Sequence, residues 1–223
     1  MKMKIVFRIV LTLLISFSSF SIVFSQDFQT RASFGVSMDL TKDLRASLEL
    51  GQRFRNNSMV NDRSLITGSV KYDLPKGFTV GGGARYMLVN SDGLLESRYR
   101  FHGDGNYRMK FSSFSVKLRE RVQYGFDDIY PGSSNKLTSR SRVGVEYDIF
   151  GTPFSLYSSF EIYLVLNDPT SYSPYTLNKV VAGMSWNLPK KLNLKLYYLL
   201  EDELNVWNPQ QAHIVVAALG LKL

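Results

Sequence analysis

The feature that most constrains the fold of this chain is an alternation of polar and apolar residues that runs from Gln26 to the last residue. In the stretch 96–109 the polar set is Arg98, Arg100, His102, Asp104, Asn106 and Arg108, and the other set is Tyr99, Phe101, Gly103, Gly105 and Tyr107. A period of two residues predicts a β-strand with two unlike faces. Because one face is so highly charged, we expect the apolar face to meet lipid and the charged face to line an interior. In lipid every backbone polar group must be paired within the protein, so such a sheet has to close.

The alternation divides the chain into eleven candidate strands, which are 27–40, 44–55, 63–74, 78–89, 96–109, 111–126, 137–149, 154–166, 176–188, 192–204 and 212–223. Each is longer than the roughly five or six residues of an average strand. Beyond residue 25, no stretch approaches the roughly 18 consecutive apolar residues of a membrane helix. The expected fold class is therefore all-β.

The connections between these segments alternate in length. Short ones read TKD, PKG, RMK, FGTP and PKK, and longer, more polar ones read NNSMVND, NSDGLL, DDIYPGSSNK, NDPTSYSPY and NVWNPQQ. Short periplasmic turns at one end and longer extracellular loops at the other are typical of outer-membrane barrels. The rhythm predicts a closed antiparallel transmembrane β-barrel of roughly 10–12 strands.

The exact number of strands stays open, because bacterial barrels of this kind have an even number. Either 27–40 is not a full barrel strand, which leaves ten strands, or one long segment is broken, which makes twelve.

Aromatic residues on the apolar faces form two groups. Those beside the short connections are Tyr72, Phe78, Tyr107, Tyr147, Phe154 and Trp186, and those towards the long ones are Phe54, Tyr86, Tyr99, Tyr124 and Phe126. Two aromatic rows that flank an aliphatic band are expected where rings lie at the two interfaces of a membrane. The alternative is that they are ordinary strand aromatics in the core of a soluble sandwich.

The first 25 residues have the three parts of an export signal. Lys2, Lys4 and Arg8 accompany the apolar run 9–17, and Val23 and Ser25 stand at the −3 and −1 positions before Gln26. This pattern predicts a cleaved signal peptide over 1–25 and an outer-membrane barrel over 26–223, located in the bacterial outer membrane.

Charge and cysteine content exclude several function classes. Removal of the signal peptide would lower the net charge from +8 to about +5, and so small an excess does not predict nucleic-acid binding. Expected partners are outer-membrane lipid and other envelope proteins. The chain has no cysteine, which excludes disulfides, thiolate metal ligands and a lipidated N-terminal cysteine.

Three segments carry a family resemblance: the opening DFQTRASFGVSMDLTKDLRASLELGQRFRNN, LRERVQYGF and SRSRVGVEY. With them the chain resembles the family called domain of unknown function 2490, small predicted outer-membrane β-barrel proteins of Bacteroidota. The resemblance covers nearly the whole mature chain. It implies the fold and the location, and it transfers no catalytic residue.

Arginines on the polar phase occur two residues apart, near the long-connection ends of the strands. The expected lumen basic cluster is Arg53, Arg55, Arg85, Arg98, Arg100, Arg119, Arg121, Arg140 and Arg142, and its acidic partners are Glu49, Asp104, Glu146, Glu161, Glu201 and Glu203. One interpretation is an interior filled by ion pairs, because a narrow barrel is packed with side chains. The other is a vestibule or narrow pore that binds or passes anions.

Catalysis has little support in the residues available. His102, with Asp104 two residues on, is the one base-and-orienter combination, and no serine stands out as its nucleophile. His213 falls on the apolar phase, and two histidines without further ligands predict no metal site. GGGAR at 81–85 lacks a following helix and is not a phosphate loop. No cofactor is expected.

The sequence therefore predicts a small outer-membrane barrel of structural or accessory type, not an enzyme, or one subunit of an envelope complex. The alternatives are a narrow anion-selective pore or vestibule and, third, a lipid-modifying enzyme.

Glu120 does not fit the alternation, because it lies on the apolar phase between Leu118 and Val122. A β-bulge near Gly125 would shift the phase and turn the carboxylate inward. Alternatively, Glu120 faces outward and meets a polar group on a partner protein.

Overall fold

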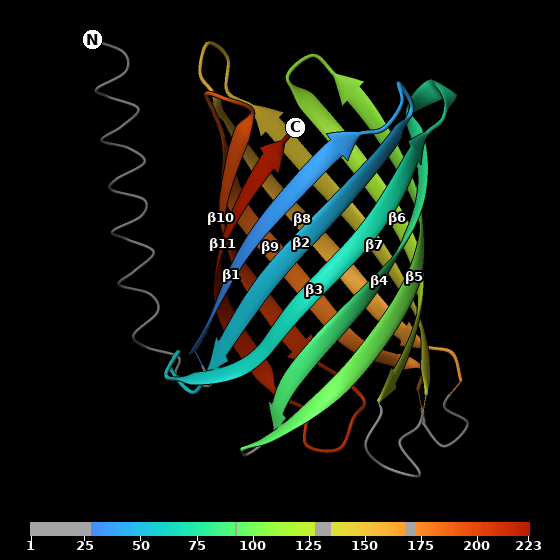
Figure 1. The fold of residues 1–223 in the computed structure, drawn as a ribbon, viewed down its shortest axis with the longest axis vertical. Coiled ribbons are helices and arrows are strands. Elements are labelled where there is room, and N and C mark those ends of the chain that lie inside the picture. The colour runs from blue at the N-terminus through green and yellow to red at the C-terminus, as the bar shows by residue number, and fades with distance from the viewer. Residues whose placement is uncertain (1–27, 92, 128–134, 168–172) are drawn as a thin grey trace.

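The computed structural model describes residues 28–91, 93–127, 135–167 and 173–223. These residues form a closed barrel of eleven strands (Figure 1). The strands are β1 (Phe28–Asp39), β2 (Leu44–Arg55), β3 (Val60–Asp73), β4 (Phe78–Ser91), β5 (Leu94–Phe111), β6 (Phe114–Asp127), β7 (Lys136–Asp148), β8 (Phe154–Val165), β9 (Tyr175–Leu188), β10 (Leu192–Glu203) and β11 (Gln211–Lys222). A single 3-10 turn, Pro75–Gly77, joins β3 to β4. The predicted signal peptide, residues 1–25, lies outside the described residues.

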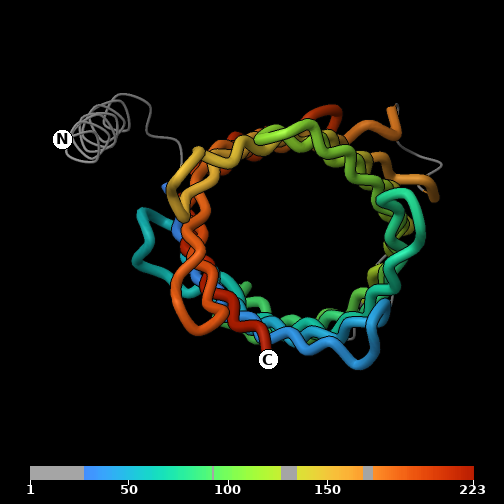
Figure 2. The backbone as a smooth tube through the Cα atoms, turned by 90° about the horizontal axis from the view of Figure 1, so that it is seen from above, coloured from blue at the N-terminus to red at the C-terminus, as the bar shows by residue number. Residues whose placement is uncertain are grey.

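Each strand pairs with the next in antiparallel fashion, and the ring closes where β1 pairs with β11 in parallel. Seen from above, the described backbone runs around a ring and no segment of it crosses the interior (Figure 2). The predicted all-β closed barrel is confirmed. Eleven strands form it, which lies within the predicted range of roughly 10–12, and neither the omission of 27–40 nor a broken segment is needed. A meander with an odd number of strands brings its first and last strands together in the same direction, which is why the closing pair is parallel.

The two ends of the barrel differ in their connections. At the upper end in Figure 1, which we call the short-turn end, β1–β2, β3–β4, β5–β6, β7–β8 and β9–β10 are joined through 40–43, 74–77, 112–113, 149–153 and 189–191. β11 also ends there, whereas β1 begins at the opposite end, the loop end. At the loop end, β6 and β7 are separated by 128–135, β8 and β9 by 166–174, and β10 and β11 by 204–210.

Two connections at the loop end are shorter than the sequence predicts, because the flanking strands continue into them. β3 begins at Val60 and follows a tight turn in which Asn56, Asn57 and Ser58 all have positive φ. β4 and β5 run on until Ser91 pairs with Leu94. The predicted RMK turn is also misplaced: β5 and β6 are joined at Ser112 and Ser113.

The outward face of the barrel is apolar and exposed. Leu50, Phe101 and Val145 each leave about half of their surface uncovered, and they alternate with inward neighbours in the pairing register. The described part of the chain contains no helix long and apolar enough to cross a membrane.

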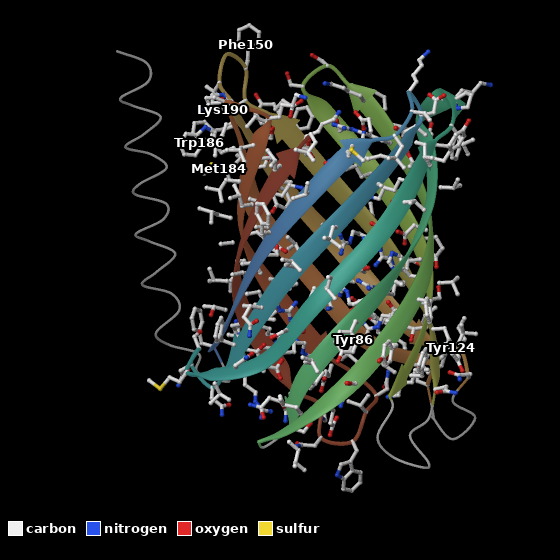
Figure 3. The ribbon with its side chains drawn as sticks, viewed as in Figure 1. Tyr86, Tyr124, Phe150, Met184, Trp186 and Lys190 are labelled. Carbon is white, nitrogen blue, oxygen red and sulfur yellow. The ribbon has the colours of Figure 1, made fainter. Side chains whose placement is uncertain are left out.

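Two rows of outward aromatic residues flank this face, as the sequence predicts. At the short-turn end the ring centroids of Phe154 and Trp186 lie 5.3 Å apart, and at the loop end those of Tyr99 and Phe126 lie 5.2 Å apart. Figure 3 shows Trp186 near one end of the wall and Tyr86 and Tyr124 towards the other.

Glu120 lies on the outward face. The pairing of β6 with both neighbours continues without a register shift through Gly125, so the predicted bulge is wrong. The register shifts that do occur lie at Arg53/Phe54 and Tyr163/Leu164.

Candidate functional site in the barrel interior

All lysine and arginine residues in the eleven strands lie on the inward phase. The register sets this phase, because residues that pair directly across two strands point to the same side of the sheet. The nine predicted basic residues therefore all face the interior.

The register brings these arginines directly opposite one another. The cross-strand pairs are Arg31–Arg53, Arg53–Arg63, Arg85–Arg100, Arg119–Arg142 and Arg121–Arg140. Like charges that face each other across two strands destabilise a sheet. Each pair therefore needs an anion, and the interior is organised by where those anions are.

Glu161 on β8 offsets the charge of the arginine pairs on β6 and β7. Its carboxylate accepts hydrogen bonds from Arg119, Arg140 and Arg142 and is only 1% exposed. The Arg142 Nη2 lies 2.6 Å from one carboxylate oxygen and the Arg140 Nε 3.0 Å from the other. One buried carboxylate thus ties three strands together.

Glu201 on β10 plays the same part at the closure of the barrel. It accepts from Arg31 at 2.8 Å and Lys179 at 2.6 Å, and Arg53 lies 3.7 Å away. Because Arg53 and Glu201 are separated by β1 and β11, this cluster spans the parallel pair. On its other side Arg53 meets Asp62, which also binds Arg63 at 2.8 Å.

Tyr163 links the two carboxylate clusters. The Arg140 guanidinium lies 4.4 Å from the centre of its ring and the Lys179 ammonium 4.9 Å from it. Such contacts are favourable because the face of an aromatic ring is electron-rich.

Asp104 holds Arg121 through two hydrogen bonds, one from Nε and one from Nη2 at 2.8 Å. His102 Nε2 lies 3.8 Å from the same carboxylate, which is beyond hydrogen-bond distance. The ring packs over Gly83, where an added Cβ would lie 2.8 Å from His102 Cε1. Among the described residues, no serine hydroxyl is hydrogen-bonded to His102.

Arg85 and Arg100 differ from the other pairs. Arg85 donates to the Thr67 hydroxyl at 2.8 Å, and Arg100 makes no hydrogen bond or ion pair with any described residue. Across the other edge of β5, Arg100 pairs with Gly125, which has no side chain to offer. Three cations, Arg85, Arg140 and Arg63, are among the groups that act electrostatically on Arg100, and the Tyr163 hydroxyl acts in the opposite sense. Among the cross-strand arginine pairs of the described chain, this pair alone makes no ion pair with a carboxylate, although Glu49 is close enough to act on Arg85.

The remaining predicted residues are dispersed. Glu146 binds Lys117 and Arg108 near the short-turn end, Arg98 binds its own neighbour Glu96 at 2.7 Å, and Arg55 donates to the Asn90 carbonyl. Glu49 faces inward without an ion pair to any described residue, and the Glu203 carboxylate accepts only from the backbone of Gln210 at 3.3 Å. Neither forms an ion pair with a described arginine of the predicted cluster, although Glu49 acts electrostatically on Arg85.

Five residues of the clusters described above were not in the predicted set: Arg31, Asp62, Arg63, Lys179 and Tyr163. All of them except Asp62 stand on the polar phase of predicted strands, so the alternation was a signal that could have found them. Asp62 fell in a predicted loop, and only the register shift beside Arg53 brings it inward.

The interior is not filled throughout. Lys195 stands in the middle of β10 on the inward phase, and Glu49 in the middle of β2, and both side chains are exposed. An inward side chain in mid-strand can be exposed only to space inside the barrel. Part of the interior is therefore wide enough to hold water. Among the described residues, no cluster of three or more metal-ligating side chains occurs.

One family model, described as Protein of unknown function (DUF2490), matches residues 28–209. No curated protein matches the chain. The β domain of the Bordetella autotransporter Brka is similar with a TM-score of 0.47 and 13% identity, over 78% of this chain and 81% of that one. A chain described under "Unveiling the Mechanism Behind the in-meso Crystallization of Membrane Proteins" has a TM-score of 0.42 and 9% identity, over 84% and 77%. These likenesses assign no role to any residue.

Proposed function

The chain belongs to the DUF2490 family of proteins of unknown function, and since the family supplies no activity, we propose one from the barrel itself: an outer-membrane β-barrel whose arginine-lined interior admits small anions. The proposal has two parts, the location of the barrel and the selectivity of its interior.

The location is supported by the outward face. A wall of half-exposed side chains such as Leu50, Phe101 and Val145 is far larger than the apolar patches that soluble monomers expose. Two aromatic rows flank that wall, and the closed ring leaves no unpaired strand edge. These are the properties that a hydrocarbon environment requires.

The single observation that carries the selectivity is the Arg85–Arg100 pair. Every other cross-strand arginine pair makes an ion pair with a protein carboxylate, whereas neither Arg85 nor Arg100 makes one with a described residue. Arg85, Arg140 and Arg63 are among the charges that act on Arg100. Guanidinium groups bind carboxylate, phosphate and halide ions readily, and rings of arginine and lysine line anion pores. An anion that enters the interior is the counter-ion this pair lacks.

A test is conductance in planar bilayers under a KCl gradient. The wild-type protein should give current steps with a reversal potential of the sign that chloride selectivity requires. Arg100→Ser should move that potential towards zero, because it removes the charge that has no partner. Arg45→Ser is the matched control: it removes the same charge from a pair with Asp39 at one end of β2 and should leave the potential nearly unchanged.

A structural role without transport is the second candidate. It is favoured by the Glu161 and Glu201 clusters, which tie neighbouring strands together across the interior. If the protein inserts, as flotation with vesicles would verify, yet gives no current steps, the anion proposal fails and the structural role stands.

A further inference from the structure

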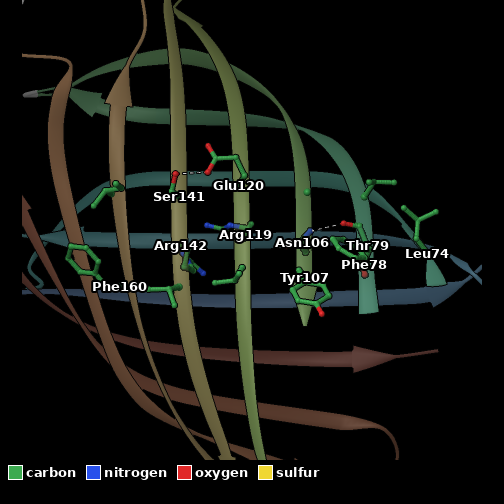
Figure 4. A pocket seen from close by; sticks show the side chains of 15 residues that line it. Leu74, Phe78, Thr79, Asn106, Tyr107, Arg119, Glu120, Ser141, Arg142 and Phe160 are labelled. Atoms are coloured by element: carbon green, nitrogen blue, oxygen red, sulfur yellow. Dashed lines mark hydrogen bonds between the residues drawn. The ribbon is translucent and has the colours of Figure 1, made fainter. Parts of the chain in front are cut away.

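Among the described residues of the outward face, Glu120 is the one acidic or basic side chain away from the strand ends. The Ser139 and Ser141 hydroxyls of β7, which also point outward, each donate a hydrogen bond to one of its two carboxylate oxygens. Figure 4 shows Glu120 and Ser141 reaching toward each other across the two strands. Glu120 thus lies in a small polar site on an otherwise apolar wall.

This polar site lies midway through the barrel wall. Glu120 lies six positions along β6 from the aromatic Phe114 at one end and six positions from Phe126 at the other. Six residues span about 20 Å along a strand. An outward carboxylate at this depth is unfavourable in lipid, and ionisable groups inside a membrane generally have a partner. The two hydroxyls leave about half of its roughly four acceptor positions free.

A groove of about 550 Å³ adjoins the carboxylate. Its lining includes the outward side chains of Val80, Tyr107, Leu118, Val143 and Phe160, of which Figure 4 labels Tyr107 and Phe160. Gly105, which pairs directly with Glu120, also lines the groove. A Cβ added at Gly105 would meet nothing within 4 Å, and the φ of this residue is not positive. Neither the neighbours nor the backbone requires glycine there, although glycine weakens a strand. Its effect is to keep the wall hollow beside the carboxylate.

The depth and chemistry of the site restrict what can occupy it. Lipid headgroups remain at the interfaces, far from mid-strand. A second copy of this chain offers no cation, because all lysines and arginines in the described strands face inward. A single segment in lipid must pair its own backbone groups, which makes it a helix, and small residues let a helix approach closely.

We propose that Glu120 and the Gly105 groove form a docking site for an apolar transmembrane helix of another protein that carries a lysine or arginine at mid-membrane. The cation pairs with the carboxylate, and the helix body fills the groove. This inference goes beyond the proposed function and shares with it only the location in a membrane.

The experiment uses the full chain in phospholipid vesicles, labelled on one cysteine introduced at the exposed Met59, since the chain has no other. The probe is a synthetic leucine–alanine transmembrane helix with one central lysine and an acceptor dye, compared with the same helix carrying leucine instead. We expect energy transfer above the random level for the lysine helix alone. Glu120→Gln should weaken this association about tenfold, in line with the strength of polar contacts between membrane segments.

Two glycine variants test the groove. Gly105→Leu should also weaken association, because its side chain occupies the groove. Gly68→Leu is the matched control, since Gly68 also meets nothing within 4 Å, lies outside the groove and should leave association unchanged. Equal transfer for both helices, or no effect of Glu120→Gln, overturns the proposal. Self-association of the barrel that depends on Glu120 overturns it in favour of a second copy. Flotation of the vesicles separates these results from a failure of the barrel to insert.

Discussion

At the scale of single residues, the interior is organised by carboxylates that are shared among several cations. Glu161 forms ion pairs with three arginines, and Glu201 with two arginines and a lysine. Each carboxylate should therefore contribute more to folding stability than the partner in a single ion pair. A buried charge whose partner is removed is strongly destabilising, because it is left without compensation. The loss should therefore be largest where one anion compensates several cations.

Glu161→Gln should lower the free energy of unfolding by about 3 kcal/mol, because it leaves Arg119, Arg140 and Arg142 facing one another without a counter-charge. Urea titration of the protein in detergent micelles, followed by tryptophan fluorescence, measures this. The control Glu203→Gln removes the same charge from an exposed side chain without an ion pair to a described residue and should change stability by well under 1 kcal/mol. Equal effects of the two variants would contradict the shared role of Glu161.

The alternation identified which residues face inward, but it could not identify partners. All nine predicted arginines lie on the inward side, because a period of two fixes the side of a residue once its strand is known. Partners depend on register and on strands that are distant in the sequence. Arg98 binds Glu96, two residues away on the same strand, whereas Arg53 reaches Glu201 across the closure of the barrel. That closure is not encoded in any local pattern.

At the scale of strands, glycines have two opposite roles in the wall. Gly183 on β9 faces inward between Tyr157 on β8 and Tyr197 on β10, whose rings meet edge to face at 6.1 Å. An added Cβ would lie 2.6 Å from the Leu196 carbonyl oxygen and closer still to the Tyr197 side chain. Gly68 faces outward, where an added Cβ meets nothing.

Gly183→Ala should destabilise the barrel by about 1–3 kcal/mol, because β9 and β10 must separate to admit the methyl group. Gly68→Ala should raise stability by about 0.5 kcal/mol, because alanine restricts the unfolded chain and clashes with nothing. Unfolding in urea measures both changes, and the heat-dependent shift in gel mobility shows whether each variant forms a barrel. If the Gly183→Ala protein were as stable as wild type, β9 and β10 would have to lie farther apart at Gly183 than the distances to Leu196 and Tyr197 indicate.

The ends of the strands were the least predictable part of each element. Backbone pairing continues past the last clear polar–apolar alternation when a tight turn can close the hairpin, as at Asn56–Ser58 and between Ser91 and Leu94. Residues with positive φ make such turns possible, and serine at 112 takes this conformation without being a typical turn signal. Strand cores were therefore predicted well and turns less so.

At the scale of the whole molecule, the odd number of strands requires the closing pair to be parallel, because the first and last strands of the meander run in the same direction. The sequence contained eleven alternating segments, and the general preference for even numbers favoured ten or twelve. That preference reflects barrels that close with antiparallel pairs. Here β1 pairs with β11 in parallel over the register from Phe28–His213 to Ser37–Lys222, and its hydrogen bonds replace the antiparallel closure.

A disulfide across this closure provides the test of the eleven-strand ring. Ala32 on β1 and Ala217 on β11 are direct partners and both face outward, so Ala32→Cys with Ala217→Cys should form an intramolecular disulfide on mild oxidation. The chain has no other cysteine to compete. Non-reducing gels and intact mass measure the bond, and Ala32→Cys with Ala84→Cys, on the non-adjacent β4, is the control that should stay reduced. In a ten-strand barrel closed by β2 and β11, β1 would lie outside the wall, and neither cysteine pair would be held together. Failure of the Ala32→Cys and Ala217→Cys pair to oxidise in folded protein would therefore rule out the parallel closure.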